Sequence, residues 1–300
     1  MAKAREPSLS VVVPVYGAEQ SLGDLYRRLT AVLDECADAY EIILVDDRSR
    51  DRSWSVIEDL AERDTRVRGF RLGRNFGQHS ALLCGIRAAR YPVTVTLDDD
   101  LQNPPEEIPA LLAELDKGYD VVYGSPDQAE HGYVRDRASQ FTRIALRNIM
   151  GAETARYVSA YRALRTDVRD AFADYSNPFV SIDVLLTYGT NRFSHVMVRQ
   201  DPRLTGSSNY TYRKLAAHAA NMITGFTTLP LRLASLAGIA FAIVGALVLV
   251  YVLVNFIVQG GVVPGFAFLA SAIAIFSGVQ LFALGIVGEY LGRVHERTMG

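Results

Sequence analysis

Residues 93–105 read Val-Thr-Val-Thr-Leu-Asp-Asp-Asp-Leu-Gln-Asn-Pro-Pro, a β-branched apolar strand that ends abruptly in three carboxylates. Carboxylates this close repel one another, and a divalent cation with oxygen ligands is the usual solution. On an extended backbone Asp98 and Asp100 point to one face and Asp99 to the other. Gln102 adds a neutral oxygen on the Asp98 face if the backbone stays extended. The pattern predicts a metal cradle of Asp98, Asp100 and Gln102 with open positions for a substrate diphosphate; the alternative is a solvated acidic turn.

Strands alternate with helices through the first half of the chain. The apolar patterns predict strands at residues 8–15, 41–45, 67–72, 93–97 and 120–123, and helices at 21–36, 53–63, 80–89 and 105–117. This alternation is typical of an α/β, Rossmann-like fold, in which a mostly parallel sheet has helices on both faces. Ligands bind such sheets beyond the carboxyl ends of the strands. The polar residues that follow several strands, at 16–19, 46–47, 74–75 and 98–100, are therefore expected to converge on one edge.

The bulk composition excludes some classes of function. The chain has 31 Lys and Arg against 33 Asp and Glu, so no basic field indicates a nucleic-acid partner. Cys36 and Cys84 have no metal-type spacing and are expected to be reduced thiols in apolar surroundings. The N-terminus is polar and its first apolar run has strand length, which indicates no cleavable signal peptide and a cytosolic N-terminal domain.

Two uncharged apolar runs occupy the C-terminal third, at residues 233–258 and 266–287. The first is long enough to span a hydrocarbon core of roughly 30 Å, and the second carries small residues suited to close helix packing. Arg232 precedes the first run, and Arg293 and Arg297 follow the second, so the positive-inside rule places both flanks in the cytosol. We expect a multi-pass protein of the cytoplasmic (inner) membrane with two transmembrane helices and both termini cytosolic; the alternative is two buried helices of a soluble core.

The segment between these regions differs from both in its pattern of charged and apolar residues. Residues 211–231 combine basic and apolar side chains at helical spacing, which predicts interfacial amphipathic helices, or else an ordinary surface helix. The expected organisation is an N-terminal domain at 1–210, juxtamembrane helices at 211–231, and a two-helix membrane region at 232–300 with a short cytosolic tail.

Four motifs together resemble family 2 glycosyltransferases of the GT-A fold. They are Val11-Val12-Val13-Pro14-Val15-Tyr16, Val45-Asp46-Asp47-Arg48-Ser49, the loop Arg-Asn-Phe-Gly-Gln-His-Ser-Ala at 74–81, and Leu-Asp-Asp-Asp-Leu-Gln-Asn-Pro-Pro-Glu at 97–106. The strings at 227–232 and 285–293 are similar to polyprenyl-phosphate glycosyltransferases, the group of dolichyl-phosphate mannose synthase, bactoprenol glucosyltransferases and the undecaprenyl-phosphate aminoarabinose transferase. The resemblance covers nearly the whole chain.

The resemblance implies an inverting, metal-dependent enzyme that moves one sugar from a nucleotide to a polyprenyl (undecaprenyl-type) phosphate at the cytosolic membrane face. Mg²⁺ or Mn²⁺ on Asp98, Asp100 and Gln102 neutralises the leaving diphosphate, so turnover is expected to depend on Asp100. The residues implied to bind the sugar nucleotide are Pro14, Tyr16, Glu19, Asp46, Asp47, Asn75, Gln78, Asp98 and Asp99. Whether the nucleotide is UDP, GDP or dTDP stays open, and so does the formation of a homo-oligomer.

The acceptor phosphate is already anionic, so it needs cationic positioning at the membrane surface more than a general base. Arg203 lies in a segment that resembles the family's Arg-x-x-Gly-x-Ser-Lys-Tyr, and Arg162 in its Ser-x-x-Arg stretch. Both are expected to act on the acceptor, Arg203 foremost. Asp183 is the best remaining carboxylate for orienting a sugar hydroxyl or serving as a base.

The chain departs from the family pattern at Gly17-Ala18, Arg48, Arg156 and Asn209, where Asn-Glu, glycine, an acidic residue and lysine are usual. These departures leave the nucleotide, the sugar and any base open, but none touches the metal cradle. Two other functions are alternatives to this transferase. A processive polysaccharide synthase carries a Gln-x-x-Arg-Trp motif, whereas the single tryptophan here is Trp54. A non-catalytic, membrane-anchored subunit that binds a sugar nucleotide or lipid has no need of the cradle.

Overall fold

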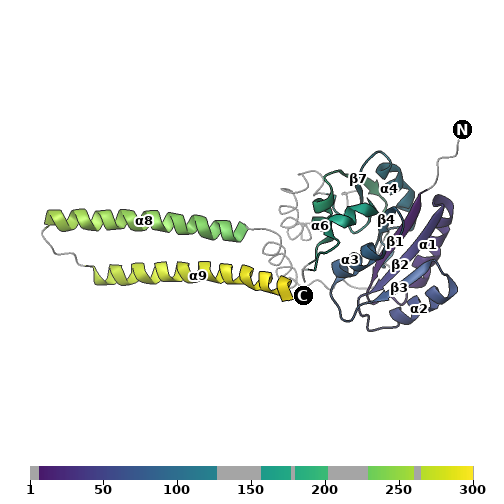
Figure 1. The fold of residues 1–300 in the computed structure, drawn as a ribbon, viewed down its shortest axis with the longest axis horizontal. Helices are drawn as coiled ribbons and strands as arrows, with labels where there is room; N and C mark the ends of the chain where they lie inside the picture. Colours follow the sequence, from purple (N-terminus) through teal and green to yellow (C-terminus); the bar gives the residue numbers. More distant parts are fainter. Residues whose placement is uncertain (1–6, 127–156, 177–179, 202–228, 260–264, 300) are drawn as a thin grey trace. The chain divides into compact units, whose positions relative to one another are not determined.

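The computed structural model describes residues 7–126, 157–176, 180–201, 229–259 and 265–299. The chain divides into two compact units, Met1–Tyr175 with Val180–Tyr212, and Ser176–Phe179 with Arg213–Gly300. Within the described part of the first unit, seven strands form one sheet in the order β3-β2-β1-β4-β6-β5-β7 (Figure 1).

The first half of the sheet is parallel. It consists of β1 (Ser8–Val15), β2 (Ala39–Asp46), β3 (Val67–Arg71) and β4 (Val93–Thr96), connected by α1 (Leu22–Cys36), α2 (Ser53–Arg63) and α3 (Gln78–Ala88). Side chains alternate along β1, so Val11 and Val13 join the core that contains α1 and α2. Val12 points to the opposite face, where α3 packs so closely that only glycine fits at position 85.

The second half of the sheet is mixed. Its strands are β5 (Val121–Pro126), β6 (Arg162–Arg165) and β7 (Phe193–Val198). The helices η1 (Pro105–Glu107) and α4 (Ile108–Leu115) lie between β4 and β5 in the chain, and η4 (Thr166–Phe172) and α6 (Ile182–Gly189) lie between β6 and β7. Strand β6 runs antiparallel to both β4 and β5, whereas β5 and β7 are parallel. The predicted α/β fold with a mostly parallel sheet is therefore confirmed.

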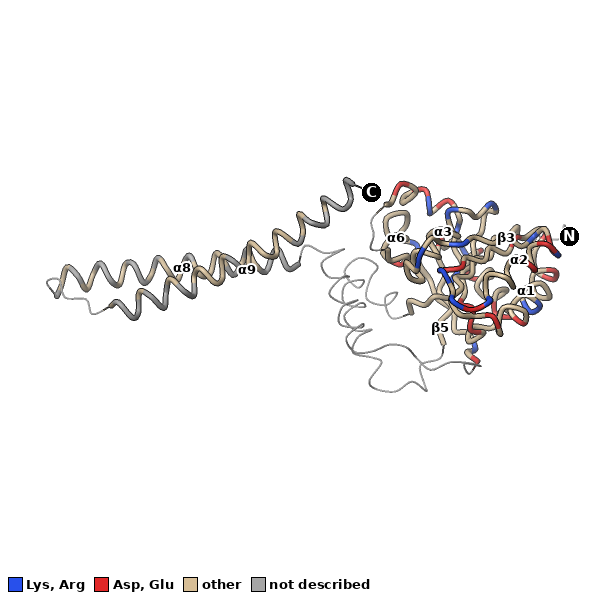
Figure 2. Tube along the Cα trace, turned by 90° about the horizontal axis from the view of Figure 1, so that it is seen from below, with Lys and Arg blue, Asp and Glu red and all other residues tan. Residues whose placement is uncertain are grey.

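The described part of the second unit consists of two long helices, α8 (Leu229–Gln259) and α9 (Phe266–Met299), which lie side by side in Figures 1 and 2. The Phe241 ring meets Phe276 edge-on, with 5.9 Å between ring centroids. Of the helices in the described ranges, none is long and apolar enough to cross a membrane. The two transmembrane helices expected from the sequence are thus not confirmed.

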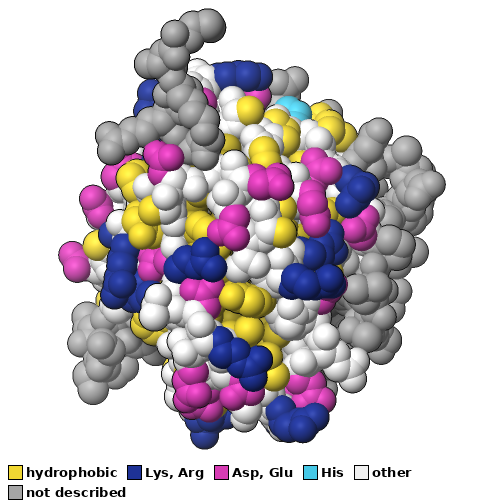
Figure 3. All heavy atoms as spheres, turned by 90° about the vertical axis from the view of Figure 1, so that its right-hand side faces the viewer, with side chains coloured by type: hydrophobic (Ala, Val, Ile, Leu, Met, Phe, Trp, Pro, Cys, Tyr) yellow, Lys and Arg dark blue, Asp and Glu magenta, His cyan; other side chains and the backbone are white. Residues whose placement is uncertain are grey.

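Charged side chains are distributed unevenly between the two units. In Figure 2 the coloured acidic and basic residues lie on the first unit, whereas the described residues of α8 and α9 are mostly uncharged. The face drawn in Figure 3 carries acidic and basic side chains side by side. No single-sign field covers the described part of that face, as the near-neutral composition leads one to expect.

Candidate functional site

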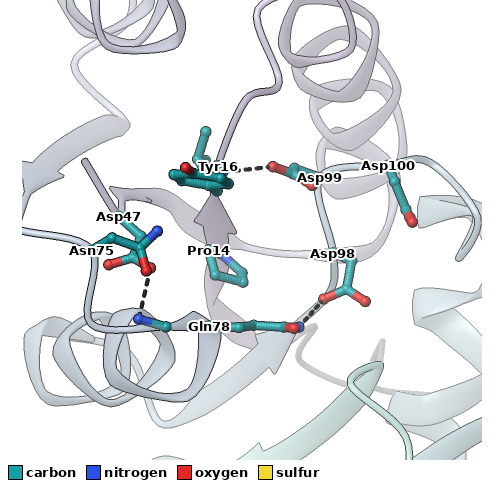
Figure 4. Close-up of a pocket in the computed structure, with 10 residues that line it drawn as sticks. Pro14, Tyr16, Asp47, Asn75, Gln78, Asp98, Asp99 and Asp100 are labelled. Carbon is teal, nitrogen blue, oxygen red and sulfur yellow. Dashed lines mark hydrogen bonds between the residues drawn. The ribbon is translucent and has the colours of Figure 1, made fainter. Parts of the chain in front are cut away.

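A pocket of about 270 Å³ lies at the carboxyl ends of β1, β2 and β4, where the sequence predicts a ligand (Figure 4). The end of β1, the end of β2, the start of α3 and the turn after β4 all contribute to it. The lining residues are Pro14, Val15, Tyr16, Asp47, Asn75, Gly77, Gln78, Asp98, Asp99 and Asp100. Four segments that are distant in the sequence therefore meet at one sheet edge.

The backbone after β4 is not extended, and this corrects the prediction made from the spacing of the aspartates. Strand β4 ends at Thr96, and the chain turns at Asp99 and Asp100. Leu101 has φ of +60° and a side chain that is buried in the core. Burying Leu101 while the chain bends toward Pro105 requires this turn, so the alternation of an extended strand stops before it reaches the carboxylates.

Each of the three carboxylates is held by a different group. The side-chain amide of Gln78 donates to Asp98 Oδ1 at 2.5 Å, the backbone N–H of Tyr16 donates to Asp99 Oδ2 at 3.0 Å, and the backbone N–H of Gln102 donates to Asp100 Oδ1 at 3.1 Å. Asp99, expected to face away, therefore lines the pocket with its neighbours (Figure 4).

The burial of Asp99 has an electrostatic consequence. The pKa of Asp99 is raised to about 7, chiefly by loss of solvent and in smaller part by the negative charges of Asp98 and Asp100, while the Tyr16 amide opposes the shift. The turn thus concentrates negative charge that a cation relieves. In the described ranges, however, no three His, Cys, Asp or Glu side chains gather closely enough to hold a metal ion.

Gln102 contributes hydrogen bonds to the acidic turn through its backbone. Its side chain is not among the groups that line the pocket. Its N–H bonds Asp100, and its carbonyl accepts the Asp201 N–H at 2.9 Å. The prediction placed the Gln102 side chain on the Asp98 side only if the backbone stayed extended, and the turn at Asp99 and Asp100 does not meet that condition.

Asp46 and Asp47 have different surroundings. Asp47 lines the pocket and accepts the N–H groups of Phe76 at 2.7 Å and Gly77 at 2.8 Å, so it fixes the loop that leads into α3. Burial raises the pKa of Asp47, although these two amides oppose the shift. Asp46 is fully buried, accepts the Ser49 N–H and lies 3.2 Å from Arg71 Nε, outside the pocket lining.

Glu19 lies at the start of α2 rather than in the pocket lining. Its carboxylate accepts the Arg52 N–H at 2.9 Å, and its own N–H donates to Asp51 Oδ2 at 3.2 Å. The first of these bonds satisfies a backbone donor where α2 begins, a usual function of acidic side chains at a helix N-terminus, and the second joins the segment before α1 to the same place.

Arg162 and Asp183 pair with each other. Arg162 is 1% exposed, and its Nη1 lies 2.6 Å from Asp183 Oδ1, which also accepts the Tyr123 hydroxyl at 3.1 Å. Arg162 Nε is buried without a hydrogen-bond partner. Neither charged residue lines the pocket. Burial and the nearby Asp183 charge keep the pKa of Tyr123 well above its ordinary value.

Arg203 lies outside the described residues, but the chain can be followed to Asp201. The Asp201 N–H bonds the Gln102 carbonyl, and its carboxylate lies 3.1 Å from Arg199 and 3.6 Å from Arg28. Arg28 also pairs with Glu106 through two hydrogen bonds. Asp201, the last described residue before the segment that carries Arg203, thus lies beside the acidic turn.

Two lining residues were not singled out from the sequence. Val15 is the last residue of β1, and a strand end carries no chemical signal of its own. Gly77 has φ of +92°, which favours glycine, and it stands in the Asn-Phe-Gly-Gln loop whose pattern was noted. That glycine was the available signal for a backbone position in the site.

Known proteins with similar sequences cover nearly the whole chain. The family model described as Glycosyl transferase family 2 matches residues 10–173. Undecaprenyl-phosphate 4-deoxy-4-formamido-L-arabinose transferase of Pseudomonas fluorescens Pf-5 is 36% identical over 291 residues, which are 96% of this chain and 86% of that protein. The enzyme of the same name from Proteus mirabilis HI4320 is 35% identical, over 96% of this chain and 89% of that protein.

Solved structures resemble the chain in fold. Mannosyl-3-phosphoglycerate synthase from Rubrobacter xylanophilus has a TM-score of 0.53 at 15% identity, over 72% of each chain. Glucosyl-3-phosphoglycerate synthase from Mycobacterium tuberculosis, in complex with Mn²⁺, uridine diphosphate and phosphoglyceric acid, has a TM-score of 0.52 at 18% identity. That match covers 73% of this chain and 76% of the other.

Proposed function

Because this chain belongs to glycosyl transferase family 2 and is therefore a glycosyltransferase, we propose that it transfers one sugar, with inversion, from a nucleotide to a polyprenyl phosphate. One observation carries the proposal. Three carboxylates after β4 share a pocket with Asp47 and the start of α3 at the carboxyl edge of the sheet, where nucleotides bind in such folds. The names of the undecaprenyl-phosphate relatives support the choice of acceptor.

A divalent cation, Mg²⁺ or Mn²⁺, suits the donor set of this pocket. Hard carboxylate oxygens are its preferred ligands, and burial and crowding of the three aspartates leave negative charge to be balanced. Asp98 and Asp100 would hold the ion. When bound, the ion supplies Lewis-acid stabilisation of the departing diphosphate. The Mn²⁺ complex of the Mycobacterium tuberculosis synthase is consistent with this expectation.

The residues of the pocket bind and orient the sugar nucleotide. The Tyr16 ring is 52% exposed and offers an apolar surface to the nucleoside, and Asn75 supplies a polar group on the side of the pocket near α3. Asp47 acts by holding the Phe76 and Gly77 amides, so those two N–H groups are directed to a carboxylate of the protein and not to a phosphate.

The acceptor supplies its own nucleophile. A phosphate oxygen attacks the anomeric carbon opposite the diphosphate, which inverts the configuration without a covalent enzyme intermediate. We assign the positioning of this phosphate to Arg203, because Asp201, two residues earlier, is bonded to Gln102 at the acidic turn. Arg162 and Asp183 support the pocket from the protein interior as a buried pair.

We also propose that α8 and α9 keep the enzyme on the cytosolic face of the inner membrane as two membrane helices. Counted on the whole sequence, residues 233–258 and 266–287 contain no charge. Where the structure describes their side chains, large apolar residues are exposed, including Leu247, Ile257 and Phe282. A polyprenyl acceptor resides in the bilayer, so an anchored enzyme meets it there.

The test uses the full chain in detergent with undecaprenyl phosphate, Mg²⁺ or Mn²⁺, and a panel of UDP-, GDP- and dTDP-sugars. We expect one donor class to be consumed and a sugar-linked lipid to form only when a divalent ion is present. Asp100→Ala is expected to abolish turnover, whereas Asp59→Ala, which removes an exposed carboxylate of α2, leaves it unchanged. Absence of turnover and of metal-dependent nucleotide binding across the panel would contradict the proposal.

A further inference from the structure

Gln78 is the first residue of α3, and its side chain lies across the floor of the pocket toward Asp98 (Figure 4). The Gln78 side-chain amide donates a hydrogen bond to Asp98 Oδ1, with 2.5 Å between Nε2 and Oδ1. Asp99 and Asp100 are held by backbone N–H groups of Tyr16 and Gln102. Asp98 accepts a hydrogen bond from a side chain of α3, an element distant from it in the sequence.

The backbone that carries Gln78 is itself fixed on both sides. Asp47 at the end of β2 holds the N–H groups of Phe76 and Gly77. On the other side, His79 Nδ1 accepts the Ile182 N–H at 3.3 Å, which ties α3 to the start of α6. The start of α3 is therefore held from both sides, by Asp47 after β2 and by Ile182 of α6. These contacts fix the backbone position from which the Gln78 side chain extends to Asp98.

A neutral amide is well suited to this position. It orients the carboxylate by donating a hydrogen bond, and it leaves the negative charge that a cation requires. A lysine or arginine at position 78 would neutralise the charge of Asp98, and a glutamate would repel the Asp98 carboxylate. Groups that hydrogen-bond metal-ligating carboxylates are a regular part of metal sites, and their removal typically weakens metal binding about 10–100-fold.

We propose that Gln78 is a positioning residue for the divalent cation: it acts through Asp98, which it orients as a ligand, and does not act as a contact to the sugar nucleotide. This inference rests on the proposed function, because it takes Asp98 as a metal ligand. It assigns Gln78 a different part from the nucleotide contact that the family resemblance implies.

The experiment measures Mn²⁺ binding to the full chain in detergent from the electron paramagnetic resonance signal of free Mn²⁺, with no sugar nucleotide present. Gln78→Met and Gln78→Leu both remove the amide donor from an exposed side chain, and each is expected to raise the Kd for Mn²⁺ about 10-fold or more. Ser80→Ala is the matched control, since it removes a bond to the Phe76 carbonyl in the same helical turn and should leave the Kd unchanged.

Thermal unfolding of all variants separates a positioning effect from a folding defect. If Gln78 had only a structural role, its substitution would lower the midpoint temperature of unfolding without a selective change in Mn²⁺ affinity. Unchanged or tighter Mn²⁺ binding in both Gln78 variants would overturn the inference while an active wild type upholds the proposed function. If the wild-type chain neither turns over nor binds any sugar nucleotide of the panel, the proposed function itself is overturned.

Discussion

Arg162 and Asp183 form an ion pair almost wholly removed from water, with the Tyr123 hydroxyl as a third member. Breaking such a pair leaves one buried charge without compensation, which costs about 3–5 kcal/mol. We expect Arg162→Met and Asp183→Asn each to lower the free energy of unfolding of the first unit by about that amount, and the Arg162→Met/Asp183→Leu double variant by less.

Urea unfolding of the full chain in detergent, followed by Trp54 fluorescence, measures this effect, since Trp54 is the single tryptophan and packs against the core of the first unit. If Arg162→Met keeps wild-type stability but loses use of the lipid phosphate, the residue contacts the acceptor, as the sequence resemblance implies, and the structural account is wrong.

Asp64 provides a pH-dependent contribution to stability at the far edge of the sheet. Hydrogen bonds from Arg66 lower its pKa to about 2, and the Tyr26 hydroxyl adds a further bond. Because the folded-state pKa lies below the ordinary value of 3.8, the stabilisation is present above about pH 4 and is lost as the pH falls toward 2.

The stability difference between wild type and Asp64→Asn is therefore expected to be largest above pH 4 and to shrink between pH 4 and pH 2. Unfolding midpoints measured across this range test the expectation. Asp59→Asn, an exposed neighbour on α2, serves as the control and should show a smaller pH-dependent difference. A wild-type-to-Asp64→Asn difference that stays constant down to pH 2 would contradict the assignment.

At the scale of elements, the packing of α3 on β1 depends on Gly85. A methyl group there would lie 2.3 Å from Val12 Cγ1 and 3.2 Å from Val45 Cγ2. We expect Gly85→Ala to destabilise the first unit by about 1–3 kcal/mol through overpacking, and Val12→Ala in the same chain to recover part of the loss. Because α3 carries Gln78, the single variant should also weaken Mn²⁺ binding.

Gly23 in α1 is the matched control, since no atom lies within 4 Å of a methyl group at that position. Gly23→Ala should leave the protein as stable as wild type or raise its stability by about 0.4–1 kcal/mol. Equal losses from both glycine substitutions in urea titrations would show that crowding against Val12 is not the cause.

Elements with a clear apolar pattern were predictable. The strand at residues 8–15 has the predicted bounds because an unbroken apolar run of strand length ends there, and the helix at 53–63 has them because its apolar residues recur at helical spacing. Strand β6 has four residues with arginine at each end, and β7 alternates weakly, so neither has a clear pattern in the sequence. Their place in the sheet comes from pairing with distant strands.

The site was predictable where residues follow strand ends and unpredictable where the backbone turns. Tyr16, Asp47 and Asp98 line the pocket because parallel strands end at a common edge. Gln102 does not, because burial of Leu101 bends the chain, and no local pattern reveals that tertiary demand. The pairing of Arg162 with Asp183 joins residues of β6 and α6, which no spacing rule connects.

At the scale of the whole molecule, membrane attachment by α8 and α9 is a proposal with a direct test. We expect the wild-type chain to stay in the membrane pellet after alkaline carbonate extraction. Leu247→Arg, which places a charge in the middle of the first apolar run, costs about 2.5–3.5 kcal/mol of insertion and should reduce the retained fraction.

Tyr188→Arg adds the same charge to an exposed position of α6 and should not change the retained fraction. Complete release of the wild-type chain by carbonate would contradict two membrane helices and indicate attachment at the surface.

The hydrogen bond between the Asp201 N–H and the Gln102 carbonyl has a practical consequence for hybrid enzymes. It joins Asp201, the last described residue before the segment that carries Arg203, to the turn that carries the acidic residues. A hybrid that takes its C-terminal part from a relative should therefore be joined after Asp201, so that Arg28, Glu106 and Asp201 all come from one parent. A junction placed earlier mixes this ion-pair cluster and is expected to disturb the acidic turn, even when every residue of the pocket is retained.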